Sequence, residues 1–302
     1  MIQYLYLGRV DYAEGLRLQA EFVDLRFQGR VENVLLLLEH PPVLTLGRNA
    51  NRANILASDQ LLASRGVTLH EINRGGDVTY HGPGQLVGYP IFDLRSLRNP
   101  NGGRLGPVDF VRLMEEALIR LCAEFGLQTG RICGLTGVWC GLPSPQPPAN
   151  ETQCAAPISS KTPSPGAGGR KIGAIGIHVA RGITSHGFAF NVTTDLRDFA
   201  LINPCGITDR PVTSLKNEIP GRETAQLPSL ETLAHRAARQ FGLVFDQHVL
   251  AVESLQALRA QAESAITTPN FHAPVFPAED TPLQVPPEIE RLRLARDPPV
   301  RA

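Results

Sequence analysis

The chain has 302 residues, of which 42% are hydrophobic and 19% charged, a composition that suits one large globular domain or two small ones. Lysine plus arginine and aspartate plus glutamate each number 29, so the charge balance does not predict a nucleic-acid footprint, although a local patch could still meet a protein partner. No apolar run approaches the roughly 20 residues of a membrane span and the N-terminus carries no secretory pattern, so we expect a cytoplasmic protein without a membrane partner.

The cysteines do not predict a disulfide framework or a metal site. Their number is odd in a chain of this length, which argues against paired cysteines. Cys133 and Cys140 have six residues between them, which is not a usual zinc spacing. Cys122 falls within an apolar helical pattern and is typical of core packing.

The N-terminal half predicts alternating helices and strands. Tyr12 to Gln28 has helical spacing and ends at a glycine, whereas short apolar runs predict strands. The last of these strands carries Pro90, which predicts an edge or a bulge at that point. The expected strands cover residues 34–38, 43–46, 69–72 and 85–94.

The C-terminal half contains the clearest helix, over residues 108–125, where a broad apolar stripe recurs at i, i+3 and i+4 and Gly126 follows as a stop. Two strands are expected at 172–179 and 184–192, joined at Arg181-Gly182. Two closing helices are expected at 230–241 and 252–266.

The strand at 184–192 has two unlike faces. Phe188, Phe190 and Val192 share one parity, and the residues between them are small or polar. Because side chains alternate faces in a strand, the face with the bulky residues is expected to pack against a core. The other face, which we call the low face, carries small or polar side chains and is expected to leave space above the strand. The low face could hold an alkyl chain, or the strand could simply be half-buried.

Two segments are expected to lack packed structure. Residues 142–169 are rich in proline, serine, alanine and glycine, which predicts a mobile inserted loop that either gates a site or is tolerated at the surface. Residues 267–302 carry recurrent prolines and predict an extended or disordered tail.

The most informative segment runs from Arg74 to Gln85, with the sequence RGGDVTYHGPGQ. Glycine allows the backbone to approach a ligand closely, so the segment is typical of a pocket wall with Arg74, Tyr80 and His81 as its polar groups. A tight hairpin at a sheet corner is the alternative.

Two later segments, Arg170-Lys171-Ile172-Gly173-Ala174-Ile175-Gly176 and Asn203-Pro204-Cys205-Gly206-Ile207, follow this motif in order. Together the three resemble the lipoyl(octanoyl) transferase family, within the wider lipoate/biotin ligase superfamily. The resemblance covers residues 36–215 and extends loosely to 265. It implies an α/β fold with a mixed β-sheet and packed helices, a lipoate/biotin protein ligase-like catalytic domain that would occupy residues 1–266.

The resemblance also implies a reaction. Cys205 would take an octanoyl group from octanoyl-acyl carrier protein as a thioester. Lys171 would then remove a proton from a lysine of a lipoyl domain, in a 2-oxoacid dehydrogenase subunit or in the glycine-cleavage H protein, as that lysine attacks. A nearby cation lowers the pKa of a thiol, but 34 residues separate Lys171 from Cys205 and only the fold could bring them together. No ATP, metal or other cofactor is expected.

The motif segments supply the expected substrate contacts, with backbone N–H groups as candidates for holding an oxyanion. His81 could act as a base, but a hydrogen-bonded structural histidine is the preferred interpretation. Two alternatives stay open: an ATP-dependent lipoate or octanoate ligase, and a non-catalytic protein that binds a lipoyl domain or acyl carrier protein. The expected substrate-binding residues are Arg74, Gly75, Gly76, Asp77, Val78, Thr79, Tyr80, His81, Ala174, Ile175, Gly176, Gly187, Phe188 and Ala189.

Overall fold

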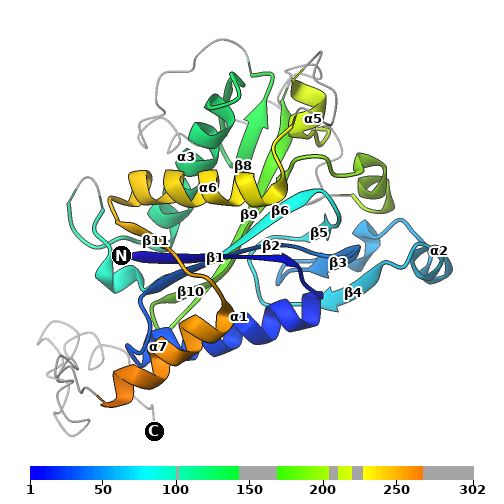
Figure 1. Cartoon of the computed structure of the whole chain (residues 1–302). Coiled ribbons are helices and arrows are strands. Elements are labelled where there is room, and N and C mark those ends of the chain that lie inside the picture. The colour runs from blue at the N-terminus through cyan, green and yellow to red at the C-terminus, as the bar shows by residue number, and fades with distance from the viewer. Residues whose placement is uncertain (100–101, 143–168, 204–209, 220–226, 268–302) are drawn as a thin grey trace, which may run out of the picture. The chain divides into compact units, whose positions relative to one another are not determined.

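The computed structural model describes residues 1–99, 102–142, 169–203, 210–219 and 227–267, and its elements belong to the unit Met1–Thr267 (Figure 1). The predicted loop at 142–169 and the tail at 267–302 lie almost wholly outside the described residues, and so does Cys205. In chain order the helices and strands are β1 (Ile2–Arg9), α1 (Tyr12–Phe27), β2 (Asn33–Glu39), β3 (Val43–Leu46), α2 (Asp59–Ser64), β4 (Thr68–Glu71), β5 (Val78–His81), β6 (Gln85–Ile91), α3 (Pro107–Ala123), β7 (Thr129–Ile132), β8 (Leu135–Cys140), β9 (Arg170–Ala180), β10 (Ile183–Asn191), α5 (Leu215–Glu218), α6 (Leu230–Phe245), β11 (Val249–Ala251) and α7 (Leu255–Thr267).

Among these elements the main sheet has eight strands in the order β11-β1-β2-β6-β10-β9-β8-β7. The pairs β11–β1 and β1–β2 are parallel, and the remaining neighbours are antiparallel. A smaller sheet in the order β4-β3-β5 is built from the chain between β2 and β6. The predicted α/β fold with a mixed sheet is confirmed.

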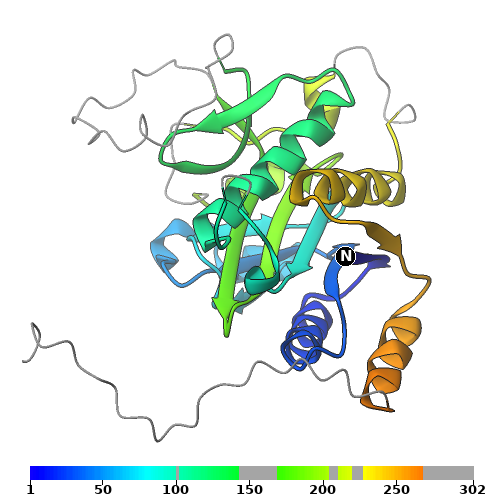
Figure 2. The same cartoon turned by 90° about the vertical axis from the view of Figure 1, so that its left-hand side faces the viewer.

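The two faces of the main sheet carry separate hydrophobic cores, as the alternation within β2 shows. Leu35 and Leu37 belong to a core with α3 and α6, whereas Leu36 and Leu38 belong to a core with α1 and α7. Figures 1 and 2 show these two pairs of helices on opposite faces. Since β2 is buried on both faces, its run of leucines reads as continuous rather than alternating.

Helix α3 forms as its spacing predicts. Pro107 occupies its first turn, where a missing N–H costs little, and Asp109 accepts a hydrogen bond from the N–H of Gly106 at 3.3 Å. Phe110, Met114 and Leu118 lie one turn apart and are fully buried against the sheet. Each such side chain contributes about 1.5–3 kcal/mol by burial.

Pro90 lies in a central strand, not at an edge, so that part of the prediction was wrong. The ladder between β6 and β10 stops at the pair Gly88–Phe188, before it reaches Pro90. Two residues before Phe188 on β10, the N–H of His186 donates to the side chain of Gln19, to Oε1 at 2.7 Å, and not to β6. Because the ladder is interrupted here, the proline removes no inter-strand hydrogen bond.

Candidate active site

A cavity of about 420 Å³ opens where β9 and β10 face the chain around Arg74. It is lined by the backbone or side chains of Tyr12, Arg74, Gly75, Gly76, Thr79, His81, Val87, Tyr89, Val111, Gly134, Leu135, Thr136, Lys171, Ala174, Ile175, Gly176, Ile177, His186, Gly187, Phe188 and Ala189. The structure therefore brings Lys171 together with eleven of the fourteen expected substrate-binding residues. It places the other three, Asp77, Val78 and Tyr80, outside the wall.

The Arg74–Gly76 loop lies against β9 at close range. The N–H of Gly75 donates to the carbonyl of Ile177 at 2.9 Å, and a Cβ at position 176 would come within 2.8 Å of the Gly75 oxygen. The guanidinium of Arg74 is buried and donates to the Thr45 carbonyl at 2.8 Å. The glycines thus let the two backbones approach each other closely, and the hydrogen bond to Thr45, on β3 of the small sheet, fixes the position of Arg74.

Strand β5 divides the rest of the motif between two sides. Thr79 and His81 face the cavity, while Val78 and Tyr80 pack in a third core with Leu44. The Tyr80 hydroxyl donates to Asp198 Oδ2 at 2.8 Å on that side. The period of two that defines a strand therefore removes Val78 and Tyr80 from the wall.

Asp77 organises the loop beside the cavity. Its carboxylate accepts from the N–H groups of Asn51 and Val78, at 3.0 and 2.7 Å, and from the side-chain amide of Asn54. The carbonyl of Asn54 in turn accepts from the N–H of Asn203 at 2.7 Å. Asp77 thus supports the position of Asn203, two residues before Cys205.

The low face of β10 forms part of the wall together with small residues of β9. Gly187 pairs with Gly176 and Ala189 with Ala174, so four small residues lie side by side. The ring of Phe188 points the other way and stacks on Phe241, with 5.5 Å between ring centroids. This arrangement leaves space on the cavity side and fills the core on the other.

A β-bulge turns Lys171 toward this cavity. Val138 and Trp139 of β8 pair with Gly173 and Lys171, so Ile172 is an extra residue in β9. Ile172 packs in the α3–α6 core, and Lys171 lies on the cavity side with its Nζ 4.6 Å from the centre of the Trp139 ring. Bulges of this kind re-aim side chains, and without it the parity of β9 would send Lys171 into the core.

Gly137 permits the close packing of β8 on this lysine. Its φ is +126°, and a Cβ there would lie 2.5 Å from the Gly173 carbonyl oxygen and 3.4 Å from Lys171 Cε. Its N–H donates to Oε1 of the fully buried Glu115 at 2.9 Å, and Arg112 and Arg131 donate to the other oxygen of that carboxylate. Helix α3 therefore anchors the strand that covers Lys171.

The chain that follows Cys205 returns to the same place. Arg210, like Lys171, contacts the Trp139 ring, with its Cζ 5.9 Å from the ring centre. The N–H of Lys171 donates to the Pro211 carbonyl at 2.9 Å, and the N–H of Thr213 donates to the Lys171 carbonyl at 2.9 Å. Residues 204–209 themselves lie outside the described residues.

The family model described as the lipoyl protein ligase A/B catalytic domain matches residues 11–242. The chain belongs to this family. An octanoyltransferase of Acidobacterium capsulatum is 56% identical over 255 residues, which cover 84% of this chain and 94% of that protein. An octanoyltransferase of Koribacter versatilis is 48% identical over 292 residues, 97% of each chain. The chain is accordingly an acyltransferase, as predicted.

Solved structures in the lipoyl protein ligase group share the fold. A lipoate-protein ligase A bound with ATP superimposes with a TM-score of 0.57 at 14% identity, covering 89% of this chain and 95% of that one. A bipartite lipoate protein ligase from Thermoplasma acidophilum gives a TM-score of 0.58 at 14% identity, with coverage of 89% and 93%. The expected ligase-like fold is confirmed.

In this lipoyl ligase-family site the histidines beside the cavity are held neutral. Burial lowers the pKa of His81 to about 3 and that of His186 to about 4. The amide of Gln85 donates to the Tyr80 carbonyl and to Asn191 Oδ1, so its oxygen accepts from His81, at 2.7 Å. This arrangement puts the proton of His81 on Nδ1 and leaves Nε2 without one.

Several residues of the cavity wall are not among those expected from the sequence. Val87 and Tyr89 follow from the alternation of β6, which places them on the same face as Ala189 and Gly187. Tyr12 and the β7–β8 turn reach the cavity only through tertiary packing. Among the residues described, no group of three His, Cys, Asp or Glu side chains could hold a metal ion, and none of the helices combines the length and hydrophobicity of a bilayer crossing.

Proposed function

We propose that this acyltransferase moves an octanoyl group from octanoyl-acyl carrier protein to a lysine of a lipoyl domain. Cys205 carries the group between the two hosts as a thioester. The observation that supports this most is the position of Lys171. It lies at a cavity whose wall includes the small residues of β9 and β10, and its backbone is hydrogen-bonded to the chain that continues from Cys205.

Chain length also favours a meeting of the two residues. Cys205 precedes Arg210 by five residues, and five residues span at most about 18 Å when fully extended. Arg210 and Lys171 contact the same indole ring. A cysteine at this position is thus within reach of the lysine, whose positive charge would favour the reactive thiolate.

The first half-reaction forms the acyl-enzyme. The Cys205 thiolate attacks the donor carbonyl, a new carbon–sulfur bond forms, and the bond to the carrier's thiol breaks. That thiol leaves as a thiolate and takes a proton from the ammonium group of Lys171, which becomes the neutral amine that the second half-reaction needs. Cavity residues such as Ala174, Gly187 and Ala189 leave room for the alkyl chain, and the neutral histidines keep additional charge away from it.

The second half-reaction forms an amide. The acceptor lysine attacks the Cys205 thioester, its nitrogen loses a proton to Lys171, and the Cys205 thiolate leaves. An amide is more stable than a thioester, so neither half-reaction requires ATP. The acceptors proposed are lipoyl domains of 2-oxoacid dehydrogenase subunits and of the glycine-cleavage H protein.

The proposal is tested with purified protein, octanoyl-acyl carrier protein and apo lipoyl domain in the absence of ATP. We expect a mass increase of one octanoyl group on the acceptor lysine, and a transient adduct of the same mass on the enzyme. Product that forms only with ATP and free octanoate would establish a ligase instead.

Two variants test the residue roles. Cys205→Ser should abolish the enzyme adduct, and Lys171→Ala should lower the transfer rate by about 10²–10⁴-fold, as for loss of a general base. An adduct that persists in Cys205→Ser refutes the nucleophile. A near-normal rate in a folded Lys171→Ala protein removes the lysine from the mechanism.

A further inference from the structure

Residues 211–213 continue the sheet beside Lys171 where β10 has ended. Val212 forms a parallel bridge with Lys171, and the backbone of Lys171 exchanges two hydrogen bonds with Pro211 and Thr213, both of 2.9 Å. The backbone of the lysine and the chain that leads from the cysteine therefore share one geometry. A shift of residues 211–213 would therefore also move the backbone of Lys171.

This segment is held from the opposite side by the side chain of Asn191. Asn191 is the last residue of β10, and its Nδ2 donates to the Thr213 carbonyl at 2.9 Å. Its Oδ1 accepts from Gln85 Nε2 at 2.9 Å. Both side chains are buried, Asn191 being 5% and Gln85 1% exposed.

The hydrogen bonds form a continuous chain from the cavity wall to the lysine. His81 donates to Gln85, Gln85 to Asn191, and Asn191 to the Thr213 carbonyl, while the N–H of Thr213 donates to the Lys171 carbonyl. An asparagine is required at its centre because the site uses one donor and one acceptor of the same amide. An aspartate would keep the shape but would present an oxygen to the Thr213 carbonyl.

We propose that Asn191 is a positioning residue for acyl transfer, which fixes residues 211–213, and hence the backbone of Lys171, relative to the cavity wall. The proposal rests on the proposed function for its kinetic part. Asn191 is absent from the cavity lining and acts through Thr213. A misplacement of about 1 Å can cost up to about 100-fold in rate.

A second set of contacts holds the same segment without Asn191. The Thr213 hydroxyl donates to Glu218 Oε1 at 2.7 Å, and Arg170 donates to both oxygens of that carboxylate, at 2.7 and 2.8 Å. These contacts keep the segment near β9 when the amide is lost. We therefore expect an Asn191 variant to fold, but to hold residues 211–213 less precisely.

The experiment compares Asn191→Asp with Asn217→Asp, the same chemical change at an exposed position on α5. Hydrogen exchange of the Thr213 amide, read by NMR, tests the holding role without any activity. We expect faster exchange in Asn191→Asp only. Equal protection in the two variants overturns the proposal, whatever reaction the enzyme performs.

Single-turnover acylation of Cys205 by octanoyl-acyl carrier protein tests the kinetic role. We expect the maximal rate constant to fall about 10–100-fold in Asn191→Asp, with little change in the concentration that gives half of this rate, because the acyl chain still enters the same cavity. Gln85→Leu should give a similar loss, and the double variant should lose little more than either alone, since both act through one chain of contacts.

The outcomes separate this proposal from the proposed function. If the wild-type protein forms no acyl-enzyme, the proposed function fails and the exchange measurement alone decides the holding role. If the wild type is active and folded Asn191→Asp matches it in rate, the positioning role is wrong. If Asn191→Asp does not fold, an unchanged rate in Gln85→Leu overturns the proposal equally.

Discussion

The ammonium group of Lys171 lies 4.6 Å from the centre of the Trp139 ring, on the cavity side of the sheet. Trp139 is almost fully buried, and its indole N–H donates to the Leu135 carbonyl at 3.2 Å, so the ring has a fixed orientation. A cation over the face of tryptophan is held by about 0.5–2 kcal/mol, depending on desolvation. Trp139 therefore restricts where the lysine can place its charge.

From this contact we predict that Trp139→Leu lowers the acyl-transfer rate by about tenfold, the equivalent of about 1.4 kcal/mol of lost positioning energy. Trp139→Phe should lose less, because it keeps an aromatic face. Steady-state transfer assays below the melting temperature measure both. Phe245→Leu, which removes a ring from the α3–α6 core away from Lys171, serves as the control for general core damage. Equal rate losses in Trp139→Leu and Phe245→Leu would contradict the prediction.

The low face of β10 predicts how acyl length can be changed. Ala189 lies beside Ala174 across the β9–β10 pair and lines the cavity with Val87. Ala189→Val adds two methyl groups to the wall. We therefore expect the transfer rate with an octanoyl donor to fall, while the rate with a shorter butyryl donor stays near that of the wild type.

The measurement is the ratio of kcat/KM for the two donors. Ala180→Val, at the end of β9 outside the cavity, provides a β-branched control in the same sheet. A preference that stays the same in Ala189→Val would show that the acyl chain does not run along this face.

Much of the fold and part of the site could be predicted from the sequence because the deciding signals are local. The stripe on α3 and the small residues at 187 and 189 are periodic patterns that short windows contain. The contacts of Lys171 are not local. Its orientation depends on one extra residue, Ile172, which only the register of β8 and β9 reveals.

The same limit applies to the elements that were not expected. Strands β1 and β11 lie 240 residues apart in the chain and pair in parallel, and no short window contains both. The motif predicts Val78 and Tyr80 in the cavity wall, whereas the alternation of β5 places them in the third core. A motif identifies a segment, but the strand period decides which of its side chains face the ligand.

Buried histidines predict a loss of stability in mild acid. Burial lowers the pKa of His40 to about 4, against the ordinary value of 6.5, and His81 and His186 behave likewise. The unfolded chain takes up protons below pH 6.5 and the folded chain does not until about pH 4. The stability is therefore complete above pH 6.5 and declines as the pH falls, by roughly 2 kcal/mol per histidine between pH 6.5 and 5.

Urea unfolding at half-unit pH steps measures this decline. His40→Gln should have a shallower dependence of the unfolding free energy on pH, since one titrating group is gone. Phe245→Leu, which disturbs the α3–α6 core but removes no titrating group, should keep the wild-type slope. A wild-type unfolding free energy that stays constant from pH 6.5 to 5 would falsify the assignment of these side chains as buried neutral bases.

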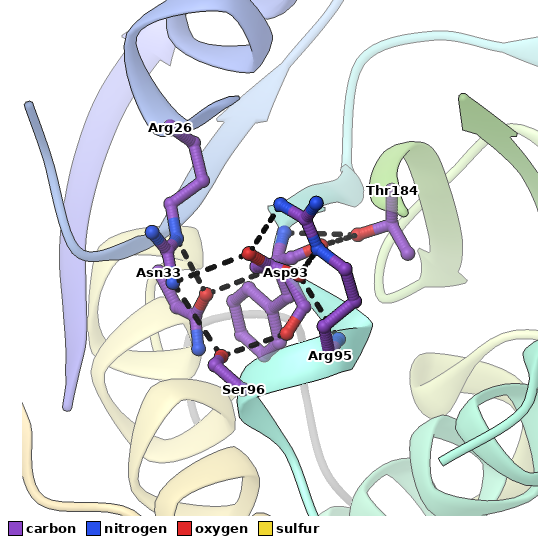
Figure 3. Close-up of polar contacts among 7 residues, drawn as sticks. Arg26, Asn33, Asp93, Arg95, Ser96 and Thr184 are labelled. Carbon is purple, nitrogen blue, oxygen red and sulfur yellow. Dashed lines mark hydrogen bonds and ion pairs between the residues drawn. The ribbon is translucent and has the colours of Figure 1, made fainter. Parts of the chain in front are cut away.

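The far end of β6 carries a polar cluster that predicts a stability change without an activity change. Figure 3 shows Asp93 between Arg95, Arg26 and the chain around Asn33. Arg95 donates to both oxygens of Asp93 at 2.8 Å, and Asn33 Oδ1 accepts from the Asp93 N–H at 2.9 Å. Burial alone would raise the pKa of Asp93, but the hydrogen bonds and charge of Arg95, with the charge of Arg26, bring it below its ordinary value.

Asp93→Asn should therefore lower the free energy of unfolding by about 1–3 kcal/mol, because it leaves two guanidinium groups without their charged acceptor. The wild type should lose this contribution as the pH falls through the pKa of the folded-state carboxyl, below about 3.8. Because β6 runs from Gln85, near the cavity, to Ile91, near this cluster, the change lies at the opposite end of the strand from His81. We expect the acyl-transfer rate at 25 °C to equal that of the wild type, and a large rate loss in a folded variant would show that the two ends of the sheet are coupled.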